Sequence, residues 1–142
     1  EGSAVAAAAA ALHGVKRVIL VNGPANEPAL AAVLAPQVAV LAEGCSHVLG
    51  PSTTFGKDLM PRVAALLGAP QLSDIMGVES ATRFRRPIYA GNAIATVEAP
   101  AGTVLVGTVH CAASQGCEDF PRLFRGKAAG TERGDLALQH FI

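Results

Sequence analysis

The sequence predicts an α/β fold in which an open, mostly parallel twisted sheet carries helices on both faces and ends in an antiparallel hairpin. The first observation is a short apolar run at residues 47–49, followed by a Gly-Pro break and an amphipathic run that Gly68 closes. The second is an apolar stretch at residues 71–78, which completes a strand, a helix and a strand. A crossover of this length joins parallel strands and is almost always right-handed. The third is the length, because 142 residues fit one domain with a sizeable core.

The first twenty residues predict one helix and one strand. Residues 4–12 are mostly alanine, the best helix former, with Ser3 as the expected N-cap and Gly14 as a left-handed stop. Residues 16–21 contain four consecutive apolar side chains, a density typical of a strand that is covered on both faces.

Residues 27–43 have the composition of a helix that Pro36 interrupts. Proline lacks a backbone donor and its ring clashes with the preceding turn, so we expect a short helix followed by a second one that begins near Pro36. The expected buried positions are Leu30, Val33, Leu34, Val38, Val40 and Leu41.

The next helix follows the strand at residues 47–49, and we expect its N-cap to be one of the three adjacent hydroxyl residues, Ser52, Thr53 and Thr54. Pro61 lies in its first turns, where one missing donor is tolerable. Its buried face is expected at Leu59, Val63, Leu66 and Leu67.

Beyond Asn92 the pattern changes from crossover units to adjacent strands. Residues 94–97 and 104–109 are apolar and flank a loop that contains proline and glycine, which predicts an antiparallel hairpin. Glycines interrupt every helical pattern in residues 111–142. We therefore expect a domain over residues 1–110 and a divergent, loosely ordered tail over residues 111–142.

The composition excludes several classes of protein. Hydrophobic residues make up 51% of the chain and charged residues 15%, yet no apolar run reaches the roughly 18 residues that a membrane helix needs. Eleven basic and eleven acidic side chains cancel, so the chain has no net field that would attract nucleic acid or a membrane surface. Three cysteines without tight pairing argue against a secreted disulfide framework. We expect a soluble intracellular protein.

Residues 50–57 invite comparison with a phosphate-binding loop, because glycines, hydroxyls and a lysine lead into a helix. The spacing does not fit, since the Walker pattern needs four residues between its glycines and a hydroxyl residue after the lysine. Here five residues separate Gly50 from Gly56, and Asp58 follows Lys57. We expect a capped helix rather than an anion site, with Lys57 and Arg62 on a solvated or partner-facing surface.

No other pattern predicts a catalytic, cofactor-binding or metal-binding residue. His110, Cys111, Cys117 and His140 lack the spacing of a zinc site, so we expect free thiols and surface imidazoles. Arg83, Arg85 and Arg86 form the one basic cluster, expected to be solvated, with a partner-facing ion pair as the alternative. Three polar residues, Asp74, Tyr89 and Asn92, lie near expected strand ends, where open α/β sheets bind ligands, although Asn92 beside Gly91 fits a turn better.

Three blocks of sequence resemble the amino-terminal domain of the alpha subunit of electron transfer flavoprotein. They are Thr-Phe-Gly-Lys-Asp-Leu-Met-Pro-Arg-Val-Ala-Ala at residues 54–65, Ser-Asp-Ile at residues 73–75 and Arg-Pro-Ile-Tyr-Ala-Gly-Asn-Ala at residues 86–93. They occur in the family's order and spacing, and the resemblance covers about a hundred residues, to about Val106. It implies a Rossmann-like fold of the adenine nucleotide alpha hydrolase type. Family members normally begin with one more strand and helix, so the resemblance also leads us to expect that this first unit is missing. After Val106 the chain departs from the family, whose members tend to continue with Val-Arg-Thr and an aromatic residue.

The resemblance also implies a function without catalytic residues in this chain. The family's heterodimer carries electrons from acyl-CoA dehydrogenases of fatty acid β-oxidation to a membrane quinone oxidoreductase. Its FAD is held mainly by the alpha subunit's carboxy-terminal domain, absent here, and its AMP by the beta subunit, so no cofactor is expected in this chain alone. The expected role is a heterodimerisation scaffold, in the mitochondrial matrix of a eukaryote or the cytoplasm of a bacterium. The alternative is a stand-alone module of the same fold that binds an adenine nucleotide. A small hydrolase or thiol enzyme is a third hypothesis, and it would need a perturbed group such as a low-pKa cysteine.

Overall fold

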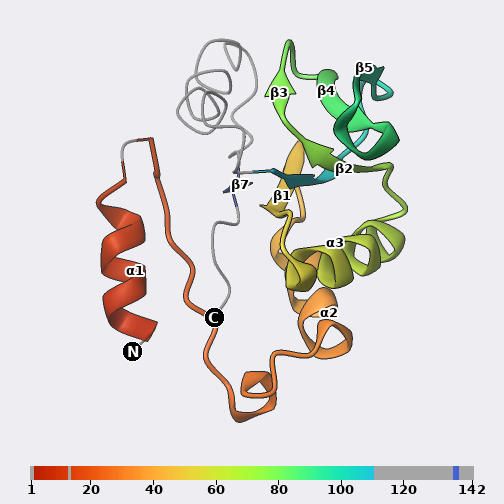
Figure 1. Cartoon of the computed structure of the whole chain (residues 1–142). Coiled ribbons are helices and arrows are strands. Elements are labelled where there is room, and N and C mark those ends of the chain that lie inside the picture. The colour runs from red at the N-terminus through yellow and green to blue at the C-terminus, as the bar shows by residue number, and fades with distance from the viewer. Residues whose placement is uncertain (1, 13, 111–135, 138–142) are drawn as a thin grey trace.

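The computed structural model describes residues 2–12, 14–110 and 136–137 (Figure 1). Its elements follow the order α1 (Gly2–Ala10), η1 (Pro24–Asn26), α2 (Ala31–Leu41), β1 (His47–Pro51), α3 (Thr54–Leu67), β2 (Gln71–Ile75), β3 (Gly77–Val78), β4 (Arg83–Ile88), η2 (Tyr89–Gly91), β5 (Ala93–Glu98), β6 (Leu105–Val109) and β7 (Leu136–Ala137). One sheet has the order β2-β6-β1-β7 and all its pairings are parallel, and a second, antiparallel sheet has the order β3-β4-β5. The predicted α/β class with a parallel sheet is confirmed.

Helix α3 is bounded by the two signals that the sequence carries. Thr53 has an extended backbone, and its Oγ1 accepts a hydrogen bond of 3.2 Å from the backbone N–H of Gly56. Of the three expected cap residues, Thr53 is therefore the one that satisfies a free donor of the first turn. Gly68 ends the helix with φ 60°, a left-handed conformation that glycine adopts without cost.

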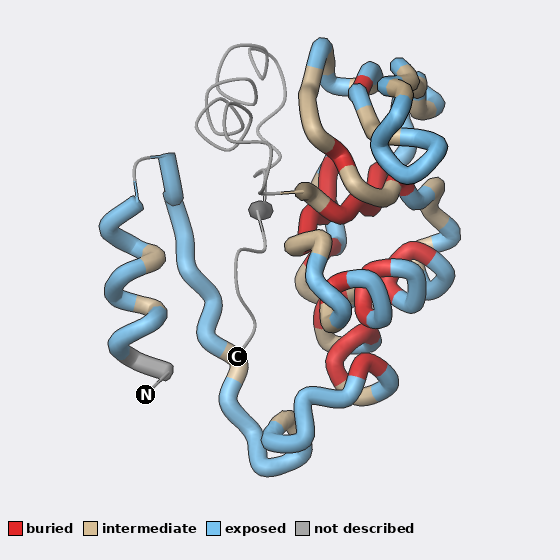
Figure 2. Tube along the Cα trace, viewed as in Figure 1, coloured by how far each residue is buried: buried red, intermediate tan, exposed pale blue. Residues whose placement is uncertain are grey.

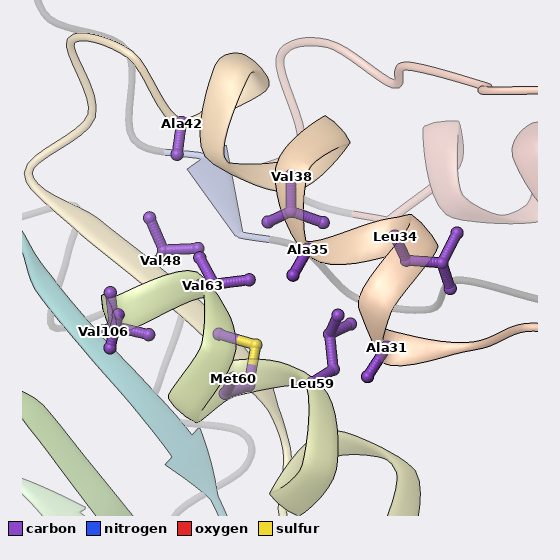
Figure 3. Close-up of a cluster of buried hydrophobic side chains, with 11 residues drawn as sticks. Ala31, Leu34, Ala35, Val38, Ala42, Val48, Leu59, Met60, Val63 and Val106 are labelled. Carbon is purple, nitrogen blue, oxygen red and sulfur yellow. The ribbon is translucent and has the colours of Figure 1, made fainter. Parts of the chain in front are cut away.

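One face of the parallel sheet packs against α2 and α3 (Figure 3). Val48 of β1 and Val106 of β6 are fully buried and meet Met60 and Val63 of α3. Two of the α2 residues in this core, Ala31 and Ala35, have small side chains, which allow α2 to pack closely on α3. The α2 residues of this core are Ala31, Leu34, Ala35 and Val38.

The antiparallel sheet covers the other face. Phe84 of β4 is fully buried against Leu49 of β1 and Ile75 of β2, and Leu72 and Leu105 complete this second core. Helices were expected on both faces, but within the described residues α2 and α3 cover one face and β3, β4 and β5 the other (Figures 1 and 2). Strand β4 can cover this face because its side chains alternate between the two sides of the strand. Phe84 is buried between the exposed Arg83 and Arg85, so the strand has one apolar side that packs on the parallel sheet.

The predicted hairpin between residues 94–97 and 104–109 is wrong. Strand β5 pairs antiparallel with β4, from Ile88↔Ala93 to Arg83↔Glu98, whereas β6 runs parallel between β1 and β2. The turn η2 reverses the chain immediately before β5, because its three residues Tyr89, Ala90 and Gly91 all have positive φ (50°, 53° and 93°). Four consecutive residues of β6 are buried, which is typical of a central parallel strand.

The predicted strand at residues 16–21 is also absent. These residues form no regular element, and Val18, Ile19 and Leu20 are exposed (Figure 2). A strand needs a neighbour to complete its hydrogen bonds. The described neighbours of β1 are β6 and β7, so residues 16–21 have no place beside it. The helix before them is confirmed, but it begins at Gly2, so Ser3 lies within it rather than at its cap.

Pro36 does not divide its helix, so the expected pair of helices is wrong. Helix α2 continues through Pro36, which costs it one backbone hydrogen bond, and the burial of Ala35 and Val38 against α3 holds the two halves together. The expected burial of Leu34 and Val38 is confirmed, whereas Leu30 and Val40 are 55% and 72% exposed. The expected strand at residues 71–78 is divided into β2 and β3, which belong to different sheets.

We predict that Gly56→Ala destabilises the chain severely. A Cβ at Gly56 would lie 1.8 Å from the carbonyl oxygen of Pro51, so the first turn of α3 would have to move away from β1. Urea unfolding should show a loss of about 3 kcal/mol or more. Gly23→Ala is the control, because its Cβ would meet nothing closer than 3.9 Å and its φ of −173° suits any residue. Equal stability of the two variants would contradict the close approach.

Candidate functional site at the carboxyl edge of the parallel sheet

Polar side chains gather where β1, β2 and β6 reach their carboxyl ends. Ser52 follows β1, Asp74 lies near the end of β2, and Thr108 and His110 lie at the end of β6 and just beyond it. Lys57 comes from the first turns of α3, which begins directly after β1. We call Ser52, Lys57, Asp74, Thr108 and His110 the edge cluster. Its position is the one at which open α/β sheets bind their ligands.

Asp74 is the centre of the edge cluster. Its Oδ1 accepts a hydrogen bond from Ser52 Oγ and lies 3.0 Å from Lys57 Nζ. Its backbone N–H donates a 2.9 Å hydrogen bond to Oγ1 of Thr108, which is fully buried. Three different elements of the fold therefore hold this one residue.

The backbone of Asp74 is unusual for a strand. Its φ is 57°, and the pairing of β2 with β6 shifts register between Leu72 and Ile75. An aspartate tolerates the left-handed region better than most residues, although the conformation still costs about 1 kcal/mol. The distortion interrupts the parallel pairing of β2 with β6, which resumes at Ile75↔Val109 before the chain crosses to the antiparallel sheet.

The environment of Asp74 favours its ionised form. The hydrogen bond from Ser52 lowers the pKa of this carboxyl most, partial burial raises it, and the contact with Lys57 and the nearby charge of His110 lower it further. The net effect is a pKa below the usual value, so the carboxylate is fully ionised at neutral pH.

His110 completes the cluster from β6. Its backbone N–H donates a 2.9 Å hydrogen bond to the carbonyl of Ile75, which places it beside the end of β2. Its ring Nδ1 is buried and has no hydrogen-bond partner among the described residues. A ring nitrogen in that position is an unused donor or acceptor, depending on the tautomer.

The edge cluster has none of the arrangements that catalyse reactions on their own. Its single carboxylate is already paired with a cation and a hydroxyl, so it is not a free base. Within residues 2–12, 14–110 and 136–137, no three His, Cys, Asp or Glu side chains are placed to bind a metal ion. Cys111, Cys117 and His140 lie outside the described residues, and the expectation of free thiols there stays a prediction.

The structure separates the other candidate residues from this edge. Tyr89 and Asn92 lie at the hairpin turn, and the N–H of Asn92 donates to the carbonyl of Tyr89 at 3.1 Å, so the turn assignment of Asn92 is confirmed. Arg83 and Arg85 are exposed beside Glu79, at 3.8 Å and 4.0 Å, and Arg62 lies 4.0 Å from Asp58. These three arginines are exposed, which fits both the solvated and the partner-facing interpretation. Arg86 differs, because its Nε is buried without a described partner.

Sequence reasoning placed Asp74 near a strand end but missed Ser52, Thr108 and His110 as its neighbours. Ser52 was considered as a helix cap and as part of a phosphate-binding loop, but not as a partner of Asp74. Thr108 and His110 could not be placed because β6 was assigned to a hairpin instead of the centre of the parallel sheet. The signal that could have found them is the apolar run of residues 104–107, which is typical of a buried parallel strand. Thr108 and His110 follow this run, at the strand end where α/β sheets bind ligands.

A second surface lies on the antiparallel sheet. We call Ile88, Tyr89 and Ile94 the hairpin surface; their exposed fractions are 37%, 79% and 53%. Tyr89 and Ala90 both have left-handed backbone conformations, which residues other than glycine rarely adopt. The hairpin surface therefore presents apolar groups on a strained turn, a combination more typical of a contact site than of a solvated loop.

The sheet order and the crossover through α3 define a Rossmann-like α/β domain, and its carboxyl-edge polar groups largely satisfy one another. The chain belongs to the electron transfer flavoprotein domain family, which it matches over residues 1–118. The family that the three sequence blocks predicted is thus confirmed.

Three similar proteins are alpha subunits of electron transfer flavoprotein. Electron transfer flavoprotein subunit alpha of Pseudomonas aeruginosa is 48% identical over 104 residues, which are 73% of this chain and 34% of the relative. The mitochondrial alpha subunit of Dictyostelium discoideum is 41% identical over 116 residues, 77% of this chain and 32% of the relative. The alpha subunit of Paracoccus denitrificans is 43% identical over 98 residues, which are 69% of this chain and 32% of the relative. The chain spans about a third of the length of these relatives.

We predict that Asp74→Asn lowers stability at pH 7 by about 1 kcal/mol, because it removes the charge that Lys57 and Ser52 bind. The folded-state pKa of Asp74 lies below its unfolded value. Its contribution is therefore complete above the unfolded pKa of about 4 and disappears as pH falls through the folded pKa. Urea unfolding should show a smaller difference between wild type and variant at pH 3 than at pH 7. Asp58→Asn is the control, because the Asp58 carboxylate is 65% exposed and its partner, Arg62, is as far as 4.0 Å away. Its replacement should therefore change stability little at either pH.

Proposed function

We propose that this chain is the amino-terminal part of an electron transfer flavoprotein alpha subunit and serves as a scaffold for heterodimerisation. The support is its family and its 41–48% identity to alpha subunits over most of its described length. We propose residues 1–110 as the scaffold domain and residues 111–142 as a separate tail. The assembled carrier would pass electrons from acyl-CoA dehydrogenases to a quinone oxidoreductase, with the FAD held by the carboxy-terminal domain outside this chain.

The proposed partner is the beta subunit of the same flavoprotein, and the hairpin surface is the proposed contact. Its residues fall in and beside the Arg-Pro-Ile-Tyr-Ala-Gly-Asn-Ala block that carries the family resemblance. Exposed aromatic and aliphatic side chains are the groups that contribute most at protein interfaces. The left-handed residues at its turn add a fixed shape, which reduces the entropy lost on binding.

The proposed compartment follows from the relatives. Those from Dictyostelium discoideum and several other eukaryotes are named as mitochondrial. We therefore propose the mitochondrial matrix for a eukaryotic source and the cytoplasm for a bacterial one. No helix within the described residues is long and apolar enough to cross a membrane.

The alternative function, a module that binds an adenine nucleotide, would use the carboxyl edge of the parallel sheet. Asp74 places a negative charge there, close to Lys57 and the start of α3. That charge repels a phosphate at the point where the fold would bind one. The edge cluster therefore favours the scaffold over the nucleotide module.

We predict that Ile94→Asp weakens assembly with a beta subunit, because it places a charge among the apolar side chains of the hairpin surface. The matched control is Val40→Asp, since Val40 is 72% exposed on α2 while Ile94 is 53% exposed on β5. Titration of the chain with a purified beta subunit should show at least a tenfold loss of affinity, about 1.4 kcal/mol, for Ile94→Asp alone. Equal effects of both variants would rule out the hairpin surface as the contact.

A ligand test separates the scaffold from the nucleotide module. We expect the thermal midpoint of the chain to stay unchanged on addition of FAD, AMP or ATP. A ligand that binds the folded chain would stabilise it by about 2.7 kcal/mol at a hundredfold excess over its Kd. A saturable rise with AMP or ATP would favour the module, and a rise with FAD would show that flavin binding does not need the carboxy-terminal domain.

A further inference from the structure

We propose that the carboxylate of Asp74 occupies, from within the chain, a binding site for a tetrahedral oxyanion such as phosphate, and that it keeps this site closed. The inference concerns the edge cluster alone and does not depend on the proposed role of the hairpin surface. It explains why a fold with a ligand-binding edge presents no open anion site there.

The donors of the edge cluster are arranged around one oxygen. Lys57 Nζ and Ser52 Oγ both contact Oδ1 of Asp74, the first at 3.0 Å and the second by a hydrogen bond. They belong to α3 and to the segment after β1, whereas Asp74 belongs to β2. A cation and a hydroxyl that converge on one anionic oxygen from a neighbouring element form the kind of charge-assisted contact that proteins use for phosphate oxygens.

His110 lies beside the end of β2, because its backbone N–H donates a 2.9 Å hydrogen bond to the carbonyl of Ile75, the residue after Asp74. Its Nδ1 is buried and without a partner among the described residues. A tetrahedral anion has oxygens in more directions than a planar carboxylate, and this nitrogen would be a further group to bind one of them.

The backbone makes the site unusually easy to open. Asp74 has φ 57°, which glycine adopts without steric cost. Asp74→Gly therefore removes the carboxylate and creates space while the backbone keeps its conformation. Asparagine also tolerates this region, but it retains the bulk of the side chain and so leaves the space filled.

A purely structural ion pair makes a different prediction. If Asp74 only ties α3 to β2, its removal lowers stability and no anion restores what is lost. If it fills an anion site, phosphate restores the lost stability through Lys57.

The experiment compares four forms of the 142-residue chain: wild type, Asp74→Gly, Asp74→Asn and the double variant Asp74→Gly with Lys57→Met. Thermal unfolding is followed by circular dichroism at pH 7 in sodium phosphate and in sodium chloride of equal ionic strength. Phosphate also stabilises proteins by exclusion from their surface, so each response is read against the double variant at the same phosphate concentration. Calorimetric titration with inorganic phosphate gives the affinity directly.

We expect a saturable rise in the midpoint of Asp74→Gly, on the order of 10 °C at a hundredfold excess of phosphate over its Kd. Wild type and Asp74→Asn should respond no more than the double variant. If Asp74→Gly is unfolded in chloride, phosphate should refold it while leaving the double variant unfolded.

Two results would overturn the proposal. One is an equal phosphate response of Asp74→Gly and the double variant, whether as a midpoint shift or as a failure to refold. The other is a specific phosphate response of the wild-type chain, because the site would then be open despite Asp74. Neither result bears on assembly with a beta subunit.

Discussion

The contact between the first turn of α3 and the end of β1 is the constraint on which the rest of the described structure depends. Gly56 comes so close to the carbonyl of Pro51 that any side chain there would collide with it. This approach lets Val63 reach the buried face of the sheet at Val48. It also sets Lys57 beside the end of β2, where its ammonium meets Asp74. One glycine thus fixes both the main core and the edge cluster.

The sequence was sufficient for the elements whose signals are local. Helix α3 has a cap, an amphipathic face and a glycine stop, and the cap and the stop were placed correctly. The expected burial of Leu59 and Val63 is confirmed, whereas Leu66 is 57% exposed. The three blocks that identified the family could also be recognised without the fold, because the match depends only on their residues and on the spacing between them. The class of fold followed from one strand, helix and strand unit.

The errors concern pairings between distant segments. Residues 16–21 have the composition of a buried strand, but composition does not say whether a neighbouring strand exists. Strand β6 was assigned to a hairpin because the left-handed backbones of Tyr89 and Ala90 could not be read from their side chains. Since β6 carries Thr108 and His110, the same error hid most of the edge cluster. Pro36 was given too much weight, because the packing of α2 on α3 outweighs one missing hydrogen bond.

The turn between β4 and β5 is strained at Tyr89 and Ala90. Two residues with side chains hold left-handed backbones where glycine would relieve the strain, and each costs roughly 1 kcal/mol. A domain selected for stability alone would have glycine at Ala90, next to Gly91. An alanine at this position keeps the backbone of the turn less adaptable than two adjacent glycines would. The strain at these two positions indicates a turn whose backbone shape counts for more than its contribution to stability.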